Sequence, residues 1–256
     1  MSDAIIKALR MDIASGRLEL GAKLPTERAL AAHFGVSQPT IREAVRALEV
    51  MGLLESRHGS GVYVTRSTRD FVTSTLETLL QMERVHMLDA FNVRRVLGMY
   101  SASLACEHAT DRDLKAMRDA MTRCDEAQDV QTIAESIVAF QVAFSAGAHN
   151  PLLFALETFL IRMLMQFQLM ANGRKGKRFW RKQADYFAPH RHRMHGMLEA
   201  HDRDGVLAEW EAYLDDQFTL FSTDPNLADV TLSDPDSIRT VDEIVLNMPS
   251  YGFTAD

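Results

Sequence analysis

The stretch Lys23–Val64, KLPTERALAAHFGVSQPTIREAVRALEVMGLLESRHGSGVYV, constrains the fold more than any other part of the chain. It predicts a helix, a tight turn, a second helix and a small β-hairpin in direct succession. Thr26 is placed to cap the first helix, and Gly35 provides the left-handed residue that ends it. Ser37 is placed to cap the second helix, and Pro39 falls in its first turn, where a missing N–H group costs little.

The second helix of this stretch has two distinct faces. One face is apolar at helical spacing and is expected to be buried: Ile41, Ala44, Val45, Leu48 and Met51. The other face presents polar side chains to solvent: Gln38, Thr40, Arg42 and Arg46. Arginine can form two hydrogen bonds with guanine and glutamine can pair with adenine, while hydroxyl and helix N–H groups bind phosphates. A helix of this kind suits the major groove of DNA.

The segment after Gly52 predicts a two-stranded β-hairpin. Its strands are Leu53–Arg57 and Val62–Thr65, and its tip is His58–Gly61. The glycines of the tip allow the hairpin to approach a DNA backbone or minor groove closely.

The whole stretch resembles the winged helix-turn-helix of GntR-type bacterial transcription regulators, and the match runs without a gap from about Asp3 to Val64. The resemblance implies DNA contacts by these residues: Arg28, Ser37, Gln38, Thr40, Arg42, His58 and Gly59. The outward position of Arg46 adds one more candidate. Many members carry arginine where Gln38 stands, so the family's guanine-centred half-site does not carry over directly. The alternative is a winged helix used only for protein contacts.

Charge is distributed unevenly along the 256 residues. The formal net charge is −7, but residues 1–66 hold nine Lys/Arg against seven Asp/Glu, which leaves about +2 on this part and about −9 on the rest. A mildly basic head on an acidic body fits a sequence-specific DNA-binding protein whose second part binds something else.

The cysteine count and the apolar runs indicate the compartment. Two cysteines, Cys106 and Cys124, are too few for a disulfide framework and suit a reducing environment. The N-terminal start lacks the apolar core of a signal peptide. The run Leu152–Met170 is interrupted by charged and polar residues, so it predicts a buried helix and not a membrane span. We expect a soluble, cytoplasmic protein without membrane contacts.

The sequence predicts a mainly α protein in four parts. Residues 1–66 form the winged helix-turn-helix with its small β-hairpin wing, residues 67–84 a linker and connecting helix, residues 85–222 an all-α bundle, and residues 223–256 an acidic tail that is loosely packed or draped over the surface. About seven helices are expected after the wing: Phe71–Met82, Met87–His108, Asp111–Ala127, Gln131–Ala148, Pro151–Met170, Lys177–His201 and Asp204–Phe221.

Three segments of the second part resemble the FCD domain of FadR-type regulators. They are NVRRVLGMYSASLA at Asn92–Ala105, FQVAFSAGAHNPLL at Phe140–Leu153, and HGMLEAHDRDGVLAEWEAYLDDQF at His195–Phe218. The resemblance implies a domain that senses a small carboxylate or acyl compound and forms a homodimer.

Many FCD domains bind a divalent metal through one Asp and three His, the first two as D-x-x-x-H on one helix. Here those two positions hold Ile137 and Gln141, the last ligand falls near Gln217, and the remaining one near Met194 or His195. Isoleucine cannot bind a metal and glutamine is a poor ligand for a transition metal, so we expect no metal and no other cofactor. A competing interpretation is a metal site made of the histidines His190, His192, His195 and His201; the simpler account is a partly exposed helix with some core contacts.

Without a metal, an anionic effector needs protein cations or helix N-termini to offset its loss of water. Arg94 matches a position where family members direct an arginine into the cavity, and we assign effector contacts to Arg94, Gln141 and His195. The alternative for Arg94 is a structural ion pair or a dimer contact. Gly98, where relatives commonly carry an acid, either enlarges the cavity or relaxes the packing. The Met- and Phe-rich run 152–170 is either plain core or an apolar pocket wall that favours an acyl or hydrophobic effector.

These observations predict an effector-controlled repressor that binds a palindromic double-stranded operator as a homodimer. One alternative is a DNA-binding dimer whose second domain has lost ligand sensing and only dimerises. An enzyme is not expected, because the chain has no nucleophile motif, no phosphate loop and no complete ligand set. A basic run is either a solvated helix start or an additional phosphate contact: Arg174, Lys175, Lys177, Arg178, Arg181 and Lys182.

Overall fold

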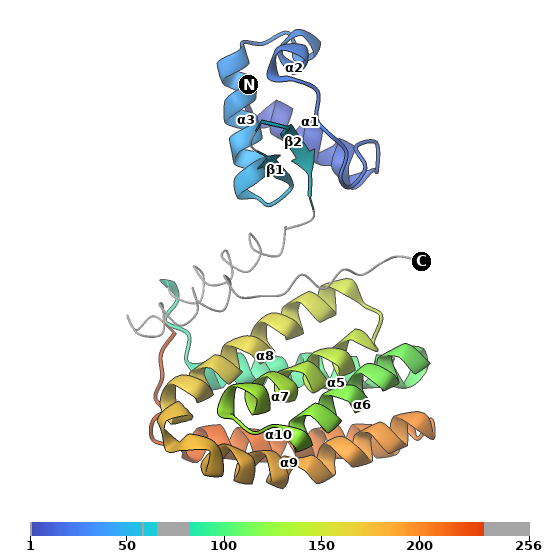
Figure 1. Cartoon of the computed structure of the whole chain (residues 1–256), viewed down its shortest axis with the longest axis vertical. Coiled ribbons are helices and arrows are strands. Elements are labelled where there is room, and N and C mark those ends of the chain that lie inside the picture. The colour runs from blue at the N-terminus through green and yellow to red at the C-terminus, as the bar shows by residue number, and fades with distance from the viewer. Residues whose placement is uncertain (1, 58, 66–81, 233–256) are drawn as a thin grey trace. The chain divides into compact units, whose positions relative to one another are not determined.

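The computed structural model describes residues 2–57, 59–65 and 82–232. The chain divides into two compact units, Met1–Thr78 and Leu79–Asp256, and each unit is described by itself (Figure 1). The helix expected at Phe71–Met82, nearly all of the linker and connecting helix, and the tail beyond Leu232 lie outside the described residues.

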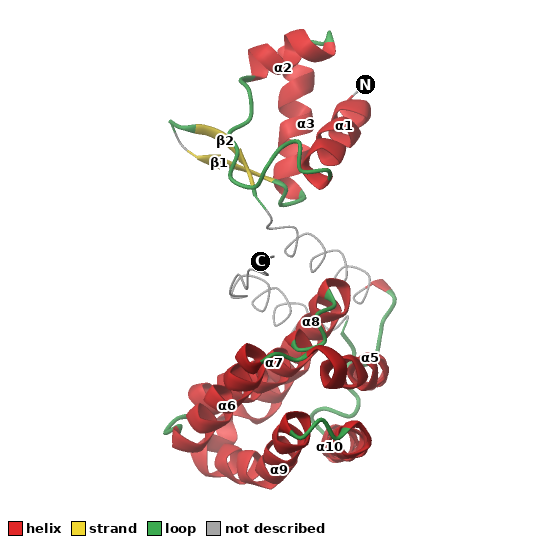
Figure 2. Cartoon of the chain, turned by 90° about the vertical axis from the view of Figure 1, so that its right-hand side faces the viewer, coloured by secondary structure: helices red, strands yellow, loops and turns green. Residues whose placement is uncertain are grey.

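The first unit is a three-helix domain with a β-hairpin wing. Its helices are α1 (Ser2–Ala14), α2 (Glu27–Phe34) and α3 (Gln38–Val50). Strands β1 (Leu54–Arg57) and β2 (Gly61–Val64) pair antiparallel, with Leu54 opposite Val64 and Arg57 opposite Gly61. Figure 2 shows this hairpin in yellow beside the helices.

The expected helix boundaries in this unit are confirmed. The side chain of Thr26 accepts a hydrogen bond from the Ala29 amide (3.3 Å), and Ser37 caps α3 by accepting from the Thr40 amide (3.4 Å). Gly35 ends α2 with φ 65°, a left-handed backbone that glycine adopts without a steric penalty. The turn between α2 and α3 is therefore determined by residues at its own two ends.

The core of the first unit lies between α1, the apolar face of α3 and the hairpin. Ile41, Ala44, Val45 and Leu48 are buried as predicted, whereas Met51 is only half-buried at the end of α3. The remaining buried members of this core are Ile5, Leu9, Leu24, Leu30, Ala31, Leu54 and Val64. Burial of one face of α3 leaves its polar face turned to solvent.

The second unit is a helical bundle, and the described helices agree with the predicted ones to within a few residues. They are α5 (Met87–His108), α6 (Asp111–Glu126), α7 (Val130–Ala146), α8 (Pro151–Asn172), a short 3₁₀ turn η1 (Gly173–Lys175), α9 (Gly176–Glu199) and α10 (Arg203–Thr223). Thr110 and Asp113 form a capping box at the start of α6. Asn150 caps α8 by accepting from the Leu153 amide (3.1 Å).

Helix α8 forms much of the interior of this bundle. By length and composition its apolar stretch could cross a membrane, but 67% of that stretch is buried inside the bundle. Phe154, Ile161, Met163 and Phe167 are among its buried side chains. This agrees with the expected core helix, and it makes plain core the better description of the Met- and Phe-rich run.

The start of the acidic tail differs from the sequence expectation. A loosely packed or draped segment was expected from residue 223 onward, but Leu227 and Leu232 are buried. The Met87 amide donates to the Val230 carbonyl (3.0 Å) and the Leu232 amide donates to the Val85 carbonyl (2.9 Å). Residues 224–232 therefore pack back onto the start of α5. Their two leucines are buried there, and their backbone forms hydrogen bonds with the backbone of residues 85–87.

Candidate functional site

The exposed face of α3 carries most of the predicted DNA-contacting residues. Gln38, Arg42 and Arg46 are exposed and Thr40 is half-buried. Around this helix, Ser37 is exposed at its N-cap, Arg28 is exposed on α2, and Gly59 is exposed at the tip of the wing with φ 70°. His58, the remaining predicted contact, lies outside the described residues. The first unit thus offers cations, an amide and a hydroxyl on one solvent-facing helix, which is what a major groove can accept.

Arg42 has a partner that the sequence did not indicate. Its Nη2 lies 2.8 Å from Glu27 Oε2 and its Nε lies 3.2 Å from Glu27 Oε1, so the pair joins α2 to α3 at two points. This hydrogen bonding lowers the pKa of the Glu27 carboxyl. Because both side chains are substantially exposed, the pair orients the guanidinium more than it stabilises the fold.

The wing brings two more cations together around one aromatic ring. The guanidinium of Arg57 lies 4.6 Å from the centre of the Tyr63 ring, and Lys23 Nζ lies 5.9 Å from it. The Tyr63 hydroxyl is 2.6 Å from Ser60 Oγ. Sequence analysis did not select Lys23, Arg57 or Tyr63, although the basic residues flanking the predicted hairpin were a visible signal.

In the second unit, Arg94 and Gln141 meet as expected, within a buried polar cluster. Arg94 on α5 is 1% exposed; its Nη1 donates to Gln217 Oε1 on α10 (3.0 Å) and its Nη2 donates to Gln141 Oε1 on α7. Gln141 Nε2 in turn donates to the Tyr213 hydroxyl (3.0 Å). Burial lowers the pKa of the Arg94 guanidinium. The Nε of Arg94 has no hydrogen-bond partner among the described residues.

A buried carboxyl group lies next to this cluster. Glu157 on α8 is 1% exposed and accepts a hydrogen bond from Ser145 Oγ (2.5 Å). Burial raises the pKa of the Glu157 carboxyl, although the charge of Arg94 acts in the opposite direction. A Cβ atom on Gly98 would lie 3.4 Å from Glu157 Oε1 and 2.8 Å from Trp210 Nε1. The space at Gly98 is therefore filled by Trp210 and Glu157, so this glycine allows the two side chains to pack closely against α5 and does not enlarge a cavity.

Replacing Gly98 by alanine is expected to destabilise the second unit by about 1–3 kcal/mol, because the added methyl group would displace an indole that is stacked on Phe144. The ring centres of Phe144 and Trp210 are 4.2 Å apart. Chemical denaturation of the full chain measures the change. Gly196→Ala is the matched control: this glycine is also helical but nothing lies within 4 Å of its Cβ position, so we expect a gain of about 1 kcal/mol there. Equal stability of Gly98→Ala and wild type would contradict the packing argument.

His195 has hydrogen-bond and ion-pair partners of its own outside the Arg94 cluster, and its assignment as an effector contact stays a prediction. It is buried, its Nε2 lies 3.0 Å from the Leu114 carbonyl oxygen on α6, and its Nδ1 lies 3.6 Å from Glu199. No hydrogen bond between described residues joins His195 to Arg94 or Gln141. The sequence could not reveal the partners of His195, because the direction of a side chain on α9 depends on how α6 packs against this helix.

The positions that the resemblance links to a metal do not fit one here. Ile137 is buried and apolar, Met194 is fully buried, and Gln141 and Gln217 both accept hydrogen bonds from the cation Arg94. The histidines have separate partners: His190 contacts Glu209 (2.5 Å) and Asp216 (3.3 Å), while His192 contacts the Ala188 carbonyl (2.9 Å). Within the part of the chain that the structure describes, no group of three His, Cys, Asp or Glu side chains could hold a metal ion.

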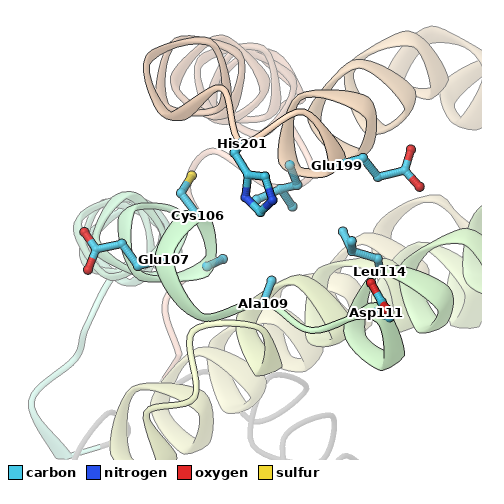
Figure 3. A pocket seen from close by; sticks show the side chains of 9 residues that line it. Cys106, Glu107, Ala109, Asp111, Leu114, Glu199 and His201 are labelled. Carbon is cyan, nitrogen blue, oxygen red and sulfur yellow. The ribbon is translucent and has the colours of Figure 1, made fainter.

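A cavity of about 230 Å³ opens at one end of the bundle, and neither Arg94 nor Gln141 lines it, although Leu114 and Glu199, the two partners of His195, do. Its walls are Ala105, Cys106, Glu107, Ala109, Asp111, Leu114, Leu198, Glu199 and His201. In Figure 3 the carboxylates of Glu107 and Glu199 point outward, away from Cys106 and His201. Glu107 pairs with Arg203 (3.2 Å) and Glu199 pairs with Arg118. The residues that line this cavity include no lysine or arginine, so the cavity walls offer an anionic effector no fixed positive charge.

A winged helix with a polar recognition face, joined in one chain to a helical domain, is the architecture of a DNA-binding transcription regulator. Residues 1–64 match the family described as bacterial regulatory proteins of the gntR family, and residues 89–216 match the FCD domain. The chain belongs to the gntR family of transcription regulators and carries an FCD domain.

Individual relatives agree with this assignment. The HTH-type transcriptional regulator LutR of Bacillus subtilis (strain 168) is 32% identical over 155 residues, which are 60% of this chain and 71% of LutR. The Uxu operon regulator of Haemophilus influenzae is 36% identical over 45% of this chain and 42% of its own length. The HTH-type transcriptional repressor NanR of Salmonella newport is 27% identical over 64% of this chain and 65% of its own. All three relatives are named as regulators.

The fold also has a counterpart among solved structures. Streptococcus agalactiae GntR superposes with a TM-score of 0.63 over 85% of this chain and 99% of that chain. Since the two sequences are 20% identical, the likeness supports the fold alone.

Proposed function

We propose that this protein is a cytoplasmic repressor of the FadR subfamily whose homodimer binds a palindromic operator and responds to a small carboxylate or acyl effector. The observation that supports an effector most directly is the guanidinium of Arg94. It is buried at the centre of the helical domain, is held by two glutamine side chains, and retains one N–H group without a partner among the described residues.

The energetics of burial favour an anionic ligand at Arg94. Arginine stays charged in proteins, and a buried cation is costly unless it is paired. The nearby Glu157 carboxyl accepts a hydrogen bond from Ser145, and no hydrogen bond or ion pair among the described residues joins it to Arg94. A bound carboxylate would supply the missing charge and accept from the free Nε–H, an arrangement that gives short, strong hydrogen bonds.

The same contacts support a response that needs no metal. Two of the positions that resemblance links to metal ligands, Gln141 and Gln217, direct their amide oxygens at Arg94. A positive charge is therefore already present where an anion would be recognised. We propose that the effector response persists in the presence of a strong chelator such as EDTA.

Selection of genomic fragments by the purified protein at physiological salt, followed by sequencing, tests the operator part of this proposal. We expect enrichment of a short two-fold-symmetric motif, because a homodimer presents two recognition helices about one helical turn of DNA apart. Only unspecific, salt-sensitive binding would count against a sequence-reading head. Genes beside the enriched motif would then indicate the chemistry of the effector.

A face of α5 supports the homodimer. Val93, Val96 and Tyr100 are 55%, 71% and 57% exposed and follow one side of the helix at i, i+3 and i+7. Contiguous apolar side chains exposed in this way mark interaction surfaces in soluble proteins. A second copy of the chain that covers this face would bury them.

Val96→Glu is expected to weaken dimerisation by about 100-fold or more, because each copy would bury an unpaired carboxylate in the interface. Analytical ultracentrifugation would then find the 28.8 kDa monomer at concentrations where the wild type is dimeric. Val50→Glu, on the equally exposed Val50 of the first unit, serves as the control and should leave the mass unchanged. An unaltered dimer of Val96→Glu would exclude this face.

A second candidate function is a DNA-binding dimer whose helical domain only dimerises. The loss of the metal-ligand side chains favours it, since Ile137 and Met194 are plain core residues. A ligand that binds the folded state must raise the melting temperature, so a screen of carboxylates by thermal denaturation separates the two candidates. No stabilisation by any compound, together with intact operator binding, would favour the second.

A further inference from the structure

A second arginine, Arg191, is buried in the helical domain and was not selected from the sequence. It lies on α9 and is 1% exposed. Its Nη2 donates to the Ala184 carbonyl (2.9 Å) and lies 3.9 Å from Cys124 Sγ. Its Nε and Nη1 have no hydrogen-bond partner among residues 2–57, 59–65 and 82–232. Two N–H-bearing nitrogens of a buried guanidinium therefore lack acceptors.

A purely structural role accounts for only one of the three nitrogens. Pro189 lies inside α9 and has no N–H group, so the backbone bonding of the preceding turn is interrupted. The bond from Arg191 Nη2 goes to the adjacent Ala184 carbonyl and not to the Asp185 carbonyl, which is the one that Pro189 leaves without a helical donor. A neutral side chain could also donate to the Ala184 carbonyl. That contact therefore explains neither the positive charge of Arg191 nor its Nε and Nη1, which have no hydrogen-bond partner among the described residues.

Arg191 and Arg94 both act on the same buried tyrosine. Tyr213 on α10 is fully buried and accepts from Gln141, which is bound to Arg94. Burial raises the pKa of the Tyr213 hydroxyl, while the charges of Arg191 and Arg94, and hydrogen bonding with Gln141 and Arg191, act on it in the opposite direction. The two guanidiniums therefore belong to one polar cluster that crosses the bundle through Gln141 and Tyr213.

The charges in this interior do not balance. Arg94 and Arg191 are two buried cations, whereas Glu157 is the one buried carboxyl among the described residues, and it interacts with Arg94. No ion pair joins Arg191 to a carboxylate in the described part of the chain. Natural proteins rarely leave a buried guanidinium without a counter-ion, because its lost hydration is then uncompensated. Arg191 thus has N–H donors without acceptors and a positive charge without a counter-ion, and the oxygen atoms of a bound anion would satisfy both.

We propose that Arg191 is a second anion-binding residue and that the effector is a small dicarboxylate, with one acidic group bound at Arg94 and the other at Arg191. The Tyr213 hydroxyl, which accepts from Gln141, donates a hydrogen bond to the same ligand. This inference rests on the proposed carboxylate response and adds a requirement to it. A compound with a single acidic group would satisfy only half of the site.

Isothermal titration of the full-length protein with matched compounds tests the inference. Malonate, succinate and glutarate are each compared with their monoamides, which have nearly the same size and lack one charge. We expect the preferred dicarboxylate to bind about 10-fold to 100-fold more tightly than its monoamide, as is usual for a buried hydrogen bond between charged groups. In Arg191→Gln this preference should disappear, while Arg191→Lys should retain part of it.

Arg181→Gln is the matched control, because Arg181 also lies on α9 and donates to backbone carbonyls, those of Cys124 and Ala127. It should keep the full preference for the dicarboxylate. Equal binding of dicarboxylate and monoamide by the wild type, or an unchanged preference in Arg191→Gln, would overturn the proposed role of Arg191. Neither result would contradict the carboxylate response proposed for Arg94. If no carboxylate of either kind binds, the proposed carboxylate response itself is overturned, and the inference with it.

Discussion

Arg42→Ala is expected to lower the affinity of the protein for its operator by about 100-fold or more, with little change in the fold. An arginine that binds the edge of a guanine at two points contributes about 1–3 kcal/mol per contact, and a dimer loses the contact in both half-sites. The guanidinium is on the exposed face of α3, and its pairing with Glu27 already holds it in one orientation. Loss of this half-exposed pair should cost less than about 1 kcal/mol of stability.

Fluorescence anisotropy with a labelled operator, set against a scrambled duplex, measures the effect of Arg42→Ala. Arg10→Ala removes one positive charge from an exposed position on α1 and controls for the general attraction to phosphates. Glu27→Gln keeps Arg42 and is expected to retain operator binding within about tenfold, since exposed ion pairs contribute little. If Arg42→Ala and Arg10→Ala weaken binding equally, Arg42 contributes charge and not base recognition.

Arg94→Gln is expected to abolish the effector response while operator binding in the absence of effector remains. The substitution removes the buried positive charge, and a carboxylate that enters the site would then lose its water without gaining a charged partner. A glutamine at this position can still donate to Gln141 or Gln217, so the polar cluster keeps part of its hydrogen bonding. The affinity for the dicarboxylate that stabilises the wild type should fall by about 100-fold or more, because a charge-assisted contact is lost together with the charge itself.

The response is measured as the change in operator affinity on addition of that compound. Arg95→Gln is the neighbouring control: Arg95 pairs with Asp215 (2.5 Å) on the surface of the bundle and should not affect the response. Circular dichroism spectra of both variants would verify that the helices persist. A full response in Arg94→Gln would show that the effector binds elsewhere, and the structural role of Arg94 in joining α5, α7 and α10 would then be its only one.

The elements of this fold could be predicted from the sequence because their signals are local. Thr26, Gly35, Ser37 and Asn150 end or begin helices through contacts that span three or four residues, and the apolar face of α3 follows from spacing alone. The family resemblance added the positions of Arg94 and Gln141, and those two side chains do meet. Met51 and the start of the tail were misjudged because burial at the end of an element depends on its neighbours.

The partners of the polar side chains could not be predicted in the same way. Arg94 and Gln217 are separated by 123 residues, and Glu27 and Arg42 by 15, so nothing in local spacing indicates that they touch. Arg191 stands in a run of basic and histidine residues, PHRHRMH, that looks like an exposed helix surface. Only the packing of α9 against α6 and α10 decides which of these side chains turns inward.

The two ends of the described part of the helical domain lie side by side, and this has a practical consequence. Residues 230–232 lie against residues 85–87, where His86 and Thr231 form an antiparallel bridge. A folded unit that enters and leaves at one point can be spliced into a surface loop of an unrelated host protein without stretching it. The segment from residue 85 to residue 232 is therefore suited to insertion as one unit, and if the proposed effector binds, its binding would be read out through the activity of a reporter enzyme used as the host.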